Sequence, residues 1–293
     1  MSVLVAADLD RTLVYSRAAL ALTSGALPEL TCVETRGGEQ VGYMTTAAAR
    51  LTAALAGRAV LMPVTTRLPE QLARIELPGP PPRFAIAANG GVLLVDGEAD
   101  PAWQRRVTRA VGDSANLSDV LRYVRQHCLP AWTSQVREAG GLFCYAVLAD
   151  AGAPDGFVAE AAAWAADRGW DVSAQGRKLY WVPRGLTKTA AVAEVAGRVG
   201  AELVLAAGDS LLDRELLCYA DRGIHPAHGE LFSSGWSAPG VECTRTAGVL
   251  AGQEIVEWLT GRVDEFSRLL GAARGGDRLN STAPAIVRRR PPR

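Results

Sequence analysis

A small group of polar side chains has the types needed to bind a cation and an anionic group together. Asp8 and Asp10 follow the first apolar run of the chain, Thr65 follows the second, and Asp209 follows a later one. Lys188 lies at the start of a predicted helix. Carboxylate oxygens are preferred ligands of Mg²⁺, and an ammonium group can hold phosphate oxygens. These residue types indicate a phosphate site that includes a metal.

The elements that must position these side chains are predicted from the same apolar runs. Residues 3–7, 59–64 and 202–207 have the apolar character of buried parallel strands, apart from Glu202 at the start of the third run. Open parallel sheets place ligands at the carboxyl ends of their strands, where the polar residues follow here. A helix over 187–199 brings Lys188 to the same side. We therefore expect one site at one edge of the sheet.

The remaining pattern completes an α/β chain with an inserted segment. A hairpin with Gly37-Gly38 at its turn is expected within 31–44, and Asn89-Gly90-Gly91 closes a further strand. In residues 96–177 two helical patterns precede two strands, and a third helix and a further strand follow. This α/β segment lies between the units of the parallel sheet, which indicates an inserted domain. Other expected elements are helices at 46–56, 69–75, 101–111, 116–127, 155–168 and 248–270, and strands at 84–88, 132–138, 142–149 and 178–182.

The ordered motifs resemble those of the haloacid-dehalogenase (HAD) superfamily. Asp8-Leu9-Asp10-Arg11-Thr12 resembles its first motif, DxDxT, and Thr65 stands at its second. Lys188 matches the third motif, and the run from Gly208 to Asp213 matches the acidic fourth, GDxxxD. Four motifs in order form a strong signal, whereas DxD alone is common.

The insertion lies between the second and third motifs, as in the branch of Cof-like, sucrose-phosphatase-like and mannosyl-3-phosphoglycerate-phosphatase-like proteins with a C2-type cap. The resemblance implies a Rossmann-like core, a parallel sheet flanked by helices, with an inserted α/β cap. The expected division is a core over 1–95 and 178–270, a cap over 96–177, and a disordered tail rich in Gly, Pro and Arg over 271–293.

The resemblance also implies a mechanism. Asp8 would attack phosphorus and form an acyl-phosphate, and Asp10 would protonate the leaving oxygen and then activate water. The resemblance implies Mg²⁺ as the cofactor. The expected phosphate-binding residues are Thr65, Thr66, Lys188 and Asn89, and the expected metal site comprises Asp8, Asp10, Asp209 and Asp213, the last of which could act from the second shell.

Several residues leave alternatives open. Arg11 stands where the family usually has Gly, and Thr66 stands where Gly is common; Arg11 could obstruct the substrate or add a phosphate-facing charge. His225 and His228 could contact substrate or a second metal, or could have no ligand role. In the inserted segment, several polar and aromatic residues could line a binding site for a phosphorylated head group, or could be ordinary core and surface residues of the cap. They are Trp132, Tyr145, Arg177, Lys178 and Tyr180.

Composition narrows the classes of partner. Lys plus Arg (31) equals Asp plus Glu (31), so no overall basic field would attract nucleic acid or anionic lipid. No apolar stretch approaches the roughly 18 residues that span a bilayer, and the N-terminus lacks a secretory pattern. Five widely spaced cysteines suit reduced thiols. We expect a cytoplasmic protein that binds a small phosphorylated metabolite; the sequence leaves its oligomeric state open.

These observations predict a hydrolase that cleaves a small phosphate monoester, with a sugar phosphate suggested by the branch resemblance. A phosphomutase is an alternative, because phosphomannomutases share this core and cap class. A binding or regulatory protein that keeps the fold without useful turnover is the alternative outside enzymes. Arg11 and Thr66 keep that alternative open. The evidence against it is the presence of the full set of four site residues, Asp8, Asp10, Lys188 and Asp209.

Overall fold

A five-stranded parallel sheet forms the centre of the computed structural model, which describes residues 2–22, 27–150 and 152–276. Its strand order is β14-β13-β12-β1-β4. Every residue of β1 is buried, as expected for a strand covered on both faces. The strands are β1 (Val3–Ala7), β4 (Val60–Pro63), β12 (Leu203–Ala207), β13 (Arg222–His225) and β14 (Val241–Cys243).

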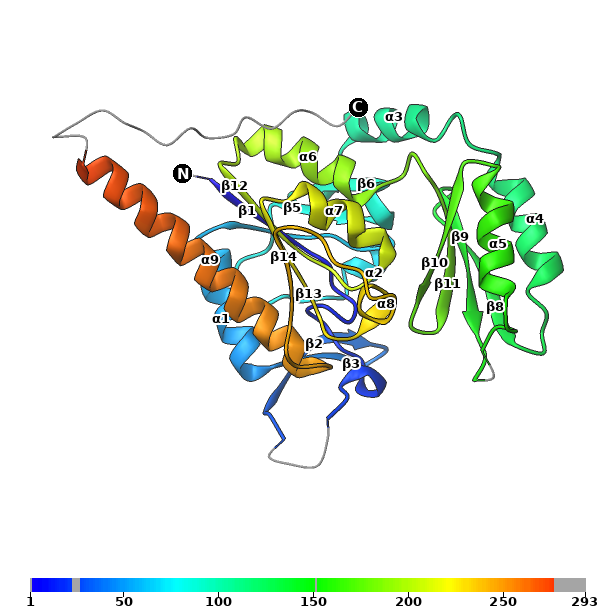
Figure 1. Cartoon of the computed structure of the whole chain (residues 1–293), viewed down its shortest axis with the longest axis horizontal. Helices are drawn as coiled ribbons and strands as arrows, with labels where there is room; N and C mark the ends of the chain where they lie inside the picture. The colour runs from blue at the N-terminus through cyan, green and yellow to red at the C-terminus, as the bar shows by residue number, and fades with distance from the viewer. Residues whose placement is uncertain (1, 23–26, 151, 277–293) are drawn as a thin grey trace.

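Helices cover both faces of this sheet (Figure 1). On one face α1 (Thr46–Ala56) contacts α9 (Val249–Gly276), and on the other α6 (Lys188–Val199) contacts α7 (Arg214–Tyr219). Successive side chains of β1 alternate between two hydrophobic clusters, because a strand directs neighbouring side chains to opposite faces. The predicted Rossmann-like layering is confirmed.

Two smaller sheets border the central one. Strands β2 (Leu30–Arg36) and β3 (Glu39–Thr45) form the predicted hairpin around Gly37-Gly38. A single parallel bridge between Val64 and Ile86 joins the central sheet to a three-stranded antiparallel sheet. Those strands are β5 (Phe84–Ala87), β6 (Val92–Val95) and β7 (Glu98–Ala99), and the nearby short helices are η1 (Arg17–Ala19), α2 (Pro69–Leu72) and η2 (Ala88–Gly90).

The inserted segment builds a separate four-stranded antiparallel sheet in the order β10-β11-β9-β8. Helices α4 and α5 lie on the face of this sheet that is turned away from the core (Figure 1). Helix α3 leads from the core into the insertion. The bounds are α3 (Pro101–Ala110), α4 (Leu117–His127), β8 (Thr133–Ala139), β9 (Phe143–Leu148), α5 (Phe157–Ala166), β10 (Trp170–Gln175) and β11 (Lys178–Pro183).

The structure corrects the expectation that the strand at 178–182 belongs to the core. Strand β11 pairs antiparallel with β10 and β9, so it belongs to the inserted sheet. Both of its faces are covered, so its apolar run has the same pattern as a parallel core strand. The division into core and cap remains a proposal, and the sheets favour a boundary after Pro183 rather than at 177/178.

Two helix ends also differ from expectation. Helix α2 stops at Leu72, short of the predicted end at residue 75. The last helix, α9, continues to Gly276, so residues 271–276 of the predicted disordered tail are helical. Residues 277–293 of that predicted tail lie outside the described residues. Within the described part of the chain, no helix combines the length and apolarity needed to cross a membrane.

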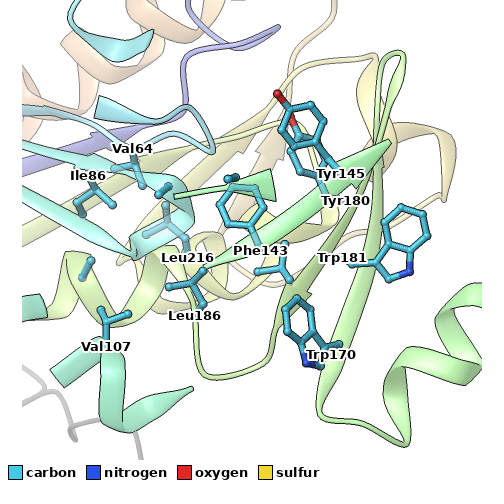
Figure 2. Close-up of a cluster of buried hydrophobic side chains, with 14 of the residues drawn as sticks. Val64, Ile86, Val107, Phe143, Tyr145, Trp170, Tyr180, Trp181, Leu186 and Leu216 are labelled. Atoms are coloured by element: carbon cyan, nitrogen blue, oxygen red, sulfur yellow. The ribbon is translucent and has the colours of Figure 1, made fainter. Parts of the chain in front are cut away.

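A continuous hydrophobic cluster joins the inserted sheet to the central one. It contains Val64 and Ile86 from the core together with Phe143 of β9 and Trp170 of β10, as Figure 2 shows. Leu186, in the connection from β11 to α6, belongs to the same cluster. Burial of such large side chains is worth about 1.5–3 kcal/mol each. The inserted sheet is therefore packed against the core on the side where the central strands end.

Candidate active site

Adjacent strand ends bring the predicted residues together. Ala7 of β1 lies in register with Ala207 of β12 on one side and with Pro63 of β4 on the other. The backbone N–H of Asp8 donates to the Ala207 carbonyl at 2.9 Å. Asp8, Thr65 and the loop after β12 consequently leave neighbouring strands at one edge of the sheet, as predicted.

Lys188 is the centre of this cluster. As the first residue of α6, it is only 1% exposed, and its Nζ donates to Asp8 Oδ1 and Asp213 Oδ1 at 2.6 Å each. Burial favours a lower pKa for Lys188, but the charges of Asp213 and Asp8 outweigh it and raise the pKa. The ammonium group therefore stays charged between two carboxylates.

The position of α6 depends on a close contact at the turn after β5. Gly90 has φ +98°, and a Cβ there would lie 2.2 Å from the carbonyl oxygen of Thr187, which precedes Lys188. Only glycine tolerates both the conformation and the approach. The Thr187 side chain accepts a hydrogen bond from the Ala190 N–H and caps the helix. The predicted Asn-Gly-Gly turn thus helps to position Lys188.

Three buried carboxylates are close enough to share a cation. Ligand oxygens of Asp8, Asp209 and Asp213 lie within 4.8 Å of one another. Burial raises the pKa of Asp8 to about 7, although Lys188 lies beside it. Burial, followed by the charges of Asp8 and Asp213, also raises the pKa of Asp209. Burial and the neighbouring carboxylates both disfavour the ionised acids, and a divalent cation with oxygen ligands would offset that cost.

The contacts of Asp213 distinguish it from the other two acids. Its Oδ1 accepts from Lys188, and its Oδ2 accepts from the Ser210 N–H at 3.0 Å and the Ser210 hydroxyl at 2.7 Å. Gly208 permits this arrangement, because a Cβ there would lie 2.4 Å from the Asp213 side chain. Both carboxylate oxygens are already engaged, so Asp213 is better placed to orient Lys188 than to bind a metal directly.

Asp10 lies in a different environment from Asp8. Arg67 donates to both of its oxygens at 2.7 Å, and the same guanidinium donates to both oxygens of Glu34 at 2.7 and 2.9 Å. Burial favours a higher pKa for Asp10, but the hydrogen bonds and charge of Arg67 outweigh it and lower the pKa. Asp10 is therefore a fixed, ionised carboxylate at rest.

The predicted phosphate-binding residues make different contacts. Thr65 is fully buried, and its Oγ1 accepts from the Arg67 N–H at 3.1 Å, which leaves its hydroxyl proton free to donate. Thr66 is buried beside Tyr180 of the inserted sheet, and it lowers the pKa of that phenol against the larger effect of burial. Asn89 Nδ2 donates to the Leu186 carbonyl at 2.9 Å, in the connection to α6, and its expected contact with phosphate stays a prediction.

Arg11 occupies a position next to the acidic cluster. Its φ is +63°, in the left-handed region that favours glycine, and its Nε lies 3.3 Å from Asp209 Oδ2. His228 holds this loop: Nδ1 accepts from the Gly248 N–H at 3.1 Å, so Nε2 is the protonated nitrogen that donates to the Arg11 carbonyl at 2.8 Å. Both ring nitrogens of His228 are thus used by the backbone.

His225 has no place in the acidic cluster. Its Nδ1 lies 3.1 Å from the Pro226 carbonyl, and its ring meets that of Trp236 edge-on. Burial lowers its pKa. Among residues 2–22, 27–150 and 152–276, one group of acidic, histidine or cysteine side chains is close enough together to hold a metal. That group is Asp8, Asp209 and Asp213. These contacts favour the alternative in which His225 and His228 have no metal-ligand role, and that role stays a prediction.

Sequence reasoning missed a contact between the core and the inserted sheet. Glu230 of α8 (Gly229–Ser233) accepts from the Ser173 hydroxyl at 2.7 Å and the Ala174 N–H at 3.0 Å, both on β10. It also accepts from the Leu211 N–H at 3.0 Å, in the short helix η3 (Leu211–Asp213). The Gln175 amide donates to the Ser210 hydroxyl at 3.1 Å. No periodicity in the sequence indicates these pairings.

Comparisons with known proteins agree with the fold. No protein-family model matches the chain, and no curated protein matches its sequence. Sucrose-phosphatase from Synechocystis sp. PCC6803, solved with sucrose and phosphate, superposes with a TM-score of 0.62 at 14% identity, over 88% of this chain and 98% of that one. A Thermoplasma acidophilum protein gives 0.56 at 15% identity, over 88% and 98%.

The C-terminal domain of C. albicans trehalose-6-phosphate phosphatase gives a TM-score of 0.53 at 13% identity, over 89% of this chain and 92% of that one. Identities this low show a shared fold and leave function to the site itself. The chain shares the fold of these structures, with the predicted Rossmann-like core and inserted α/β segment.

Proposed function

We propose that this protein is a Mg²⁺-dependent phosphatase that hydrolyses a small phosphate monoester through an aspartyl-phosphate on Asp8. The observation that carries the proposal is the buried bridge from Lys188 to Asp8 and Asp213, at 2.6 Å on each side, beside Asp209. One carboxylate is enough to pair a buried ammonium for a purely structural role. Here three carboxylates cluster near one ammonium, which indicates a site for charged ligands.

Asp8 is the proposed nucleophile. One of its oxygens attacks phosphorus in line, the bond from phosphorus to the leaving oxygen breaks, and an acyl-phosphate forms on the carboxylate. Lys188 orients Asp8 and offsets negative charge on the phosphoryl oxygens. When bound by Asp8 and Asp209, Mg²⁺ supplies further charge neutralisation between an anionic nucleophile and an anionic ester.

Asp10 is the proposed acid and base. Its ionised resting state suits the second half of the reaction, in which it accepts a proton from the water that attacks the acyl-phosphate. In the first half it must carry a proton to give to the leaving oxygen. Because Arg67 holds both carboxylate oxygens at 2.7 Å, that step requires the Arg67 contact to loosen. We propose that substrate entry provides this change.

The phosphate group is assigned to Lys188 and Thr65. Thr65 receives the Arg67 N–H through its oxygen and can therefore donate its proton to a phosphate oxygen. Thr66 and Asn89 support the site from its edges, through Tyr180 and the Leu186 carbonyl respectively. The proposed substrate is a small phosphorylated metabolite. The first substrates to test include sugar phosphates, because a sucrose-phosphatase and a trehalose-6-phosphate phosphatase share this fold.

The test measures phosphate release from sugar phosphates and a generic aryl phosphate, with Mg²⁺ or with chelator. The variants are wild type, Asp8→Asn, and Asp113→Asn as a matched control, because Asp113 is an exposed carboxylate outside the site. We expect Mg²⁺-dependent release that is lost in Asp8→Asn and kept in Asp113→Asn. Return of the phosphoryl group to a bound sugar would identify a mutase instead. No release or transfer from any ester by folded protein would contradict the proposal.

A further inference from the structure

A polar cavity of about 590 Å³ lies beside Asp10, between the core and the inserted sheet. The core contributes the first-motif loop, the β2–β3 hairpin and the segment around α2. The inserted sheet contributes β8, β9 and β11. A cavity of this size accommodates a small organic molecule. The part of a substrate beyond its reacting phosphate would lie here.

The lining of this cavity is strongly cationic. Its acidic members are Asp10 and Glu34, and both of them already receive two hydrogen bonds each from Arg67. The positive charge therefore exceeds what the local acids balance. The cationic lining residues are Arg11, Arg36, Arg67, Arg74, Arg137 and Lys178.

Lys178 is the cation with the clearest need for a ligand. Its Nζ lies 5.3 Å from the ring centre of Tyr145 and 5.9 Å from that of Tyr180, two rings that Figure 2 shows side by side. Throughout the described part of the chain, no carboxylate lies within ion-pair distance of Lys178. Burial lowers its pKa. A half-buried ammonium without a paired anion is costly, and a bound anion would remove that cost.

Strand register places a second cation on the same face. Arg137 of β8 lies opposite Tyr145 of β9, which lies opposite Tyr180 of β11. Lys178 is two residues before Tyr180, so the period of two puts Lys178, Tyr180 and Arg137 on one face of the sheet. The Arg137 Nε donates to the neutral Gln135 amide oxygen at 2.7 Å, so its charge is not balanced by that contact.

We propose that Lys178 and Arg137 bind a second anionic group of the substrate, a carboxylate or a second phosphate. The preferred substrates are then phosphate monoesters that carry another acidic group a few bonds from the ester. This inference rests on the proposed phosphatase function for the position of the reacting phosphate. A substrate whose part beyond the reacting phosphate is neutral, such as an unmodified sugar, leaves both cations without a partner and binds less well.

The first test measures binding, which does not depend on turnover. Isothermal titration in Mg²⁺ compares 3-phosphonopropanoate and propane-1,3-bisphosphonate with propylphosphonate, which lacks the second acid. Charge-assisted contacts predict at least about tenfold tighter binding of an acid-bearing ligand by wild type. We expect the preference to disappear in Lys178→Met, to weaken in Arg137→Gln, and to persist in Arg125→Gln, since Arg125 is exposed on α4, the far side of the sheet.

Which of the two acid-bearing ligands binds more tightly identifies the second group as a carboxylate or a phosphate. The second test compares turnover of 3-phosphoglycerate with that of glycerol 3-phosphate. Hydrolysis of both at equal efficiency, with equal phosphonate affinities, would overturn the inference and leave the proposed phosphatase function standing. A Lys178-dependent preference in binding without hydrolysis of any ester would support the anion pocket and contradict the proposed function. A wild-type preference that survives in Lys178→Met and Arg137→Gln would overturn the assignment of these residues.

Discussion

Asp8 and Asp10 are two residues apart, yet they lie in regions with opposite charge balance. Around Asp8, three buried carboxylates share one buried ammonium, and burial raises the pKa of Asp8 to about 7. Around Asp10, Arg67 holds both carboxylate oxygens and lowers the pKa. Identical side chains thus acquire different chemistry from their neighbours. The first region contains more carboxylates than cationic groups, whereas in the second a guanidinium holds the carboxylate of Asp10.

The largest expected effects are on turnover, and they distinguish Asp8 from Asp10 by how strongly each substitution depends on the leaving group of the ester. Asp8→Asn should reduce kcat by at least about a thousandfold for every ester, because it removes the proposed nucleophile. Asp10→Asn should reduce turnover of alkyl phosphates by about 10²–10⁴-fold, since alkoxides need a proton to leave. Its effect on the first-turnover release of p-nitrophenol should be much smaller, because p-nitrophenolate leaves without a proton and the base role of Asp10 acts only after that release. Single-turnover kinetics of both variants on both esters test this, and equal losses in the first-turnover rate for Asp10→Asn on the two esters would contradict the acid role.

Lys188→Met should have the largest effect on stability. Nζ of Lys188 pairs two buried carboxylates, and removing it leaves Asp8 and Asp213 unpaired. Breaking a buried pair in this way costs about 3–5 kcal/mol in the free energy of unfolding. Urea unfolding in chelator measures the loss, and Mg²⁺ should restore part of it by neutralising the same carboxylates. A variant as stable as wild type in chelator would show that the cluster is not charge-coupled as described.

Arg67→Met tests the second region through pH. The lowered pKa of Asp10 depends on the hydrogen bonds and charge of Arg67, so the variant should raise that pKa. The acidic limb of the kcat profile with p-nitrophenyl phosphate, whose turnover needs Asp10 as the base and not as the acid, should then move to higher pH. Arg58→Met is the control, because Arg58 pairs with Asp264 on α9, outside the site. An unmoved limb would mean that Asp10 does not govern it.

The smallest effect concerns the metal-free protein. Because the pKa of Asp8 lies near 7 when folded and near 3.8 when unfolded, the folded state keeps a proton that the unfolded chain releases. The stability from this group is therefore present at acid pH and is lost as the pH rises through about 7. Mg²⁺ needs the ionised form, so its affinity should rise over the same interval. Calorimetric Mg²⁺ titrations on either side of neutrality test this, and affinity independent of pH would contradict it.

The acidic cluster could be predicted from the sequence because each member has a local signal. Asp8, Thr65 and Asp209 follow apolar runs that fold as adjacent parallel strands, and Lys188 starts a helix whose cap residue, Thr187, precedes it. Strand ends and helix starts are local features. Parallel packing then brings them to one edge, which explains why the core of the candidate site matches expectation.

The environment of Asp10 and the inserted sheet could not be predicted in the same way. Glu34 reaches Arg67 from a hairpin 33 residues earlier, and Glu230 reaches β10 from 57 residues beyond Ser173. Side-chain pairs across such separations leave no periodic pattern. The prediction that β11 belongs to the core is wrong, because its buried, apolar run is compatible with either sheet. Tertiary packing, not local sequence, decided between them.

The most direct test of the account is whether a phosphoryl group becomes attached to Asp8. Protein incubated with a hydrolysed ester and Mg²⁺ is quenched in acid and treated with borohydride, which reduces an acyl-phosphate to the alcohol. Peptide mass spectrometry then locates the modified residue. The account predicts homoserine at Asp8, dependent on substrate and absent at Asp10. Phosphate release without modification of Asp8, or with modification at another residue, would contradict it.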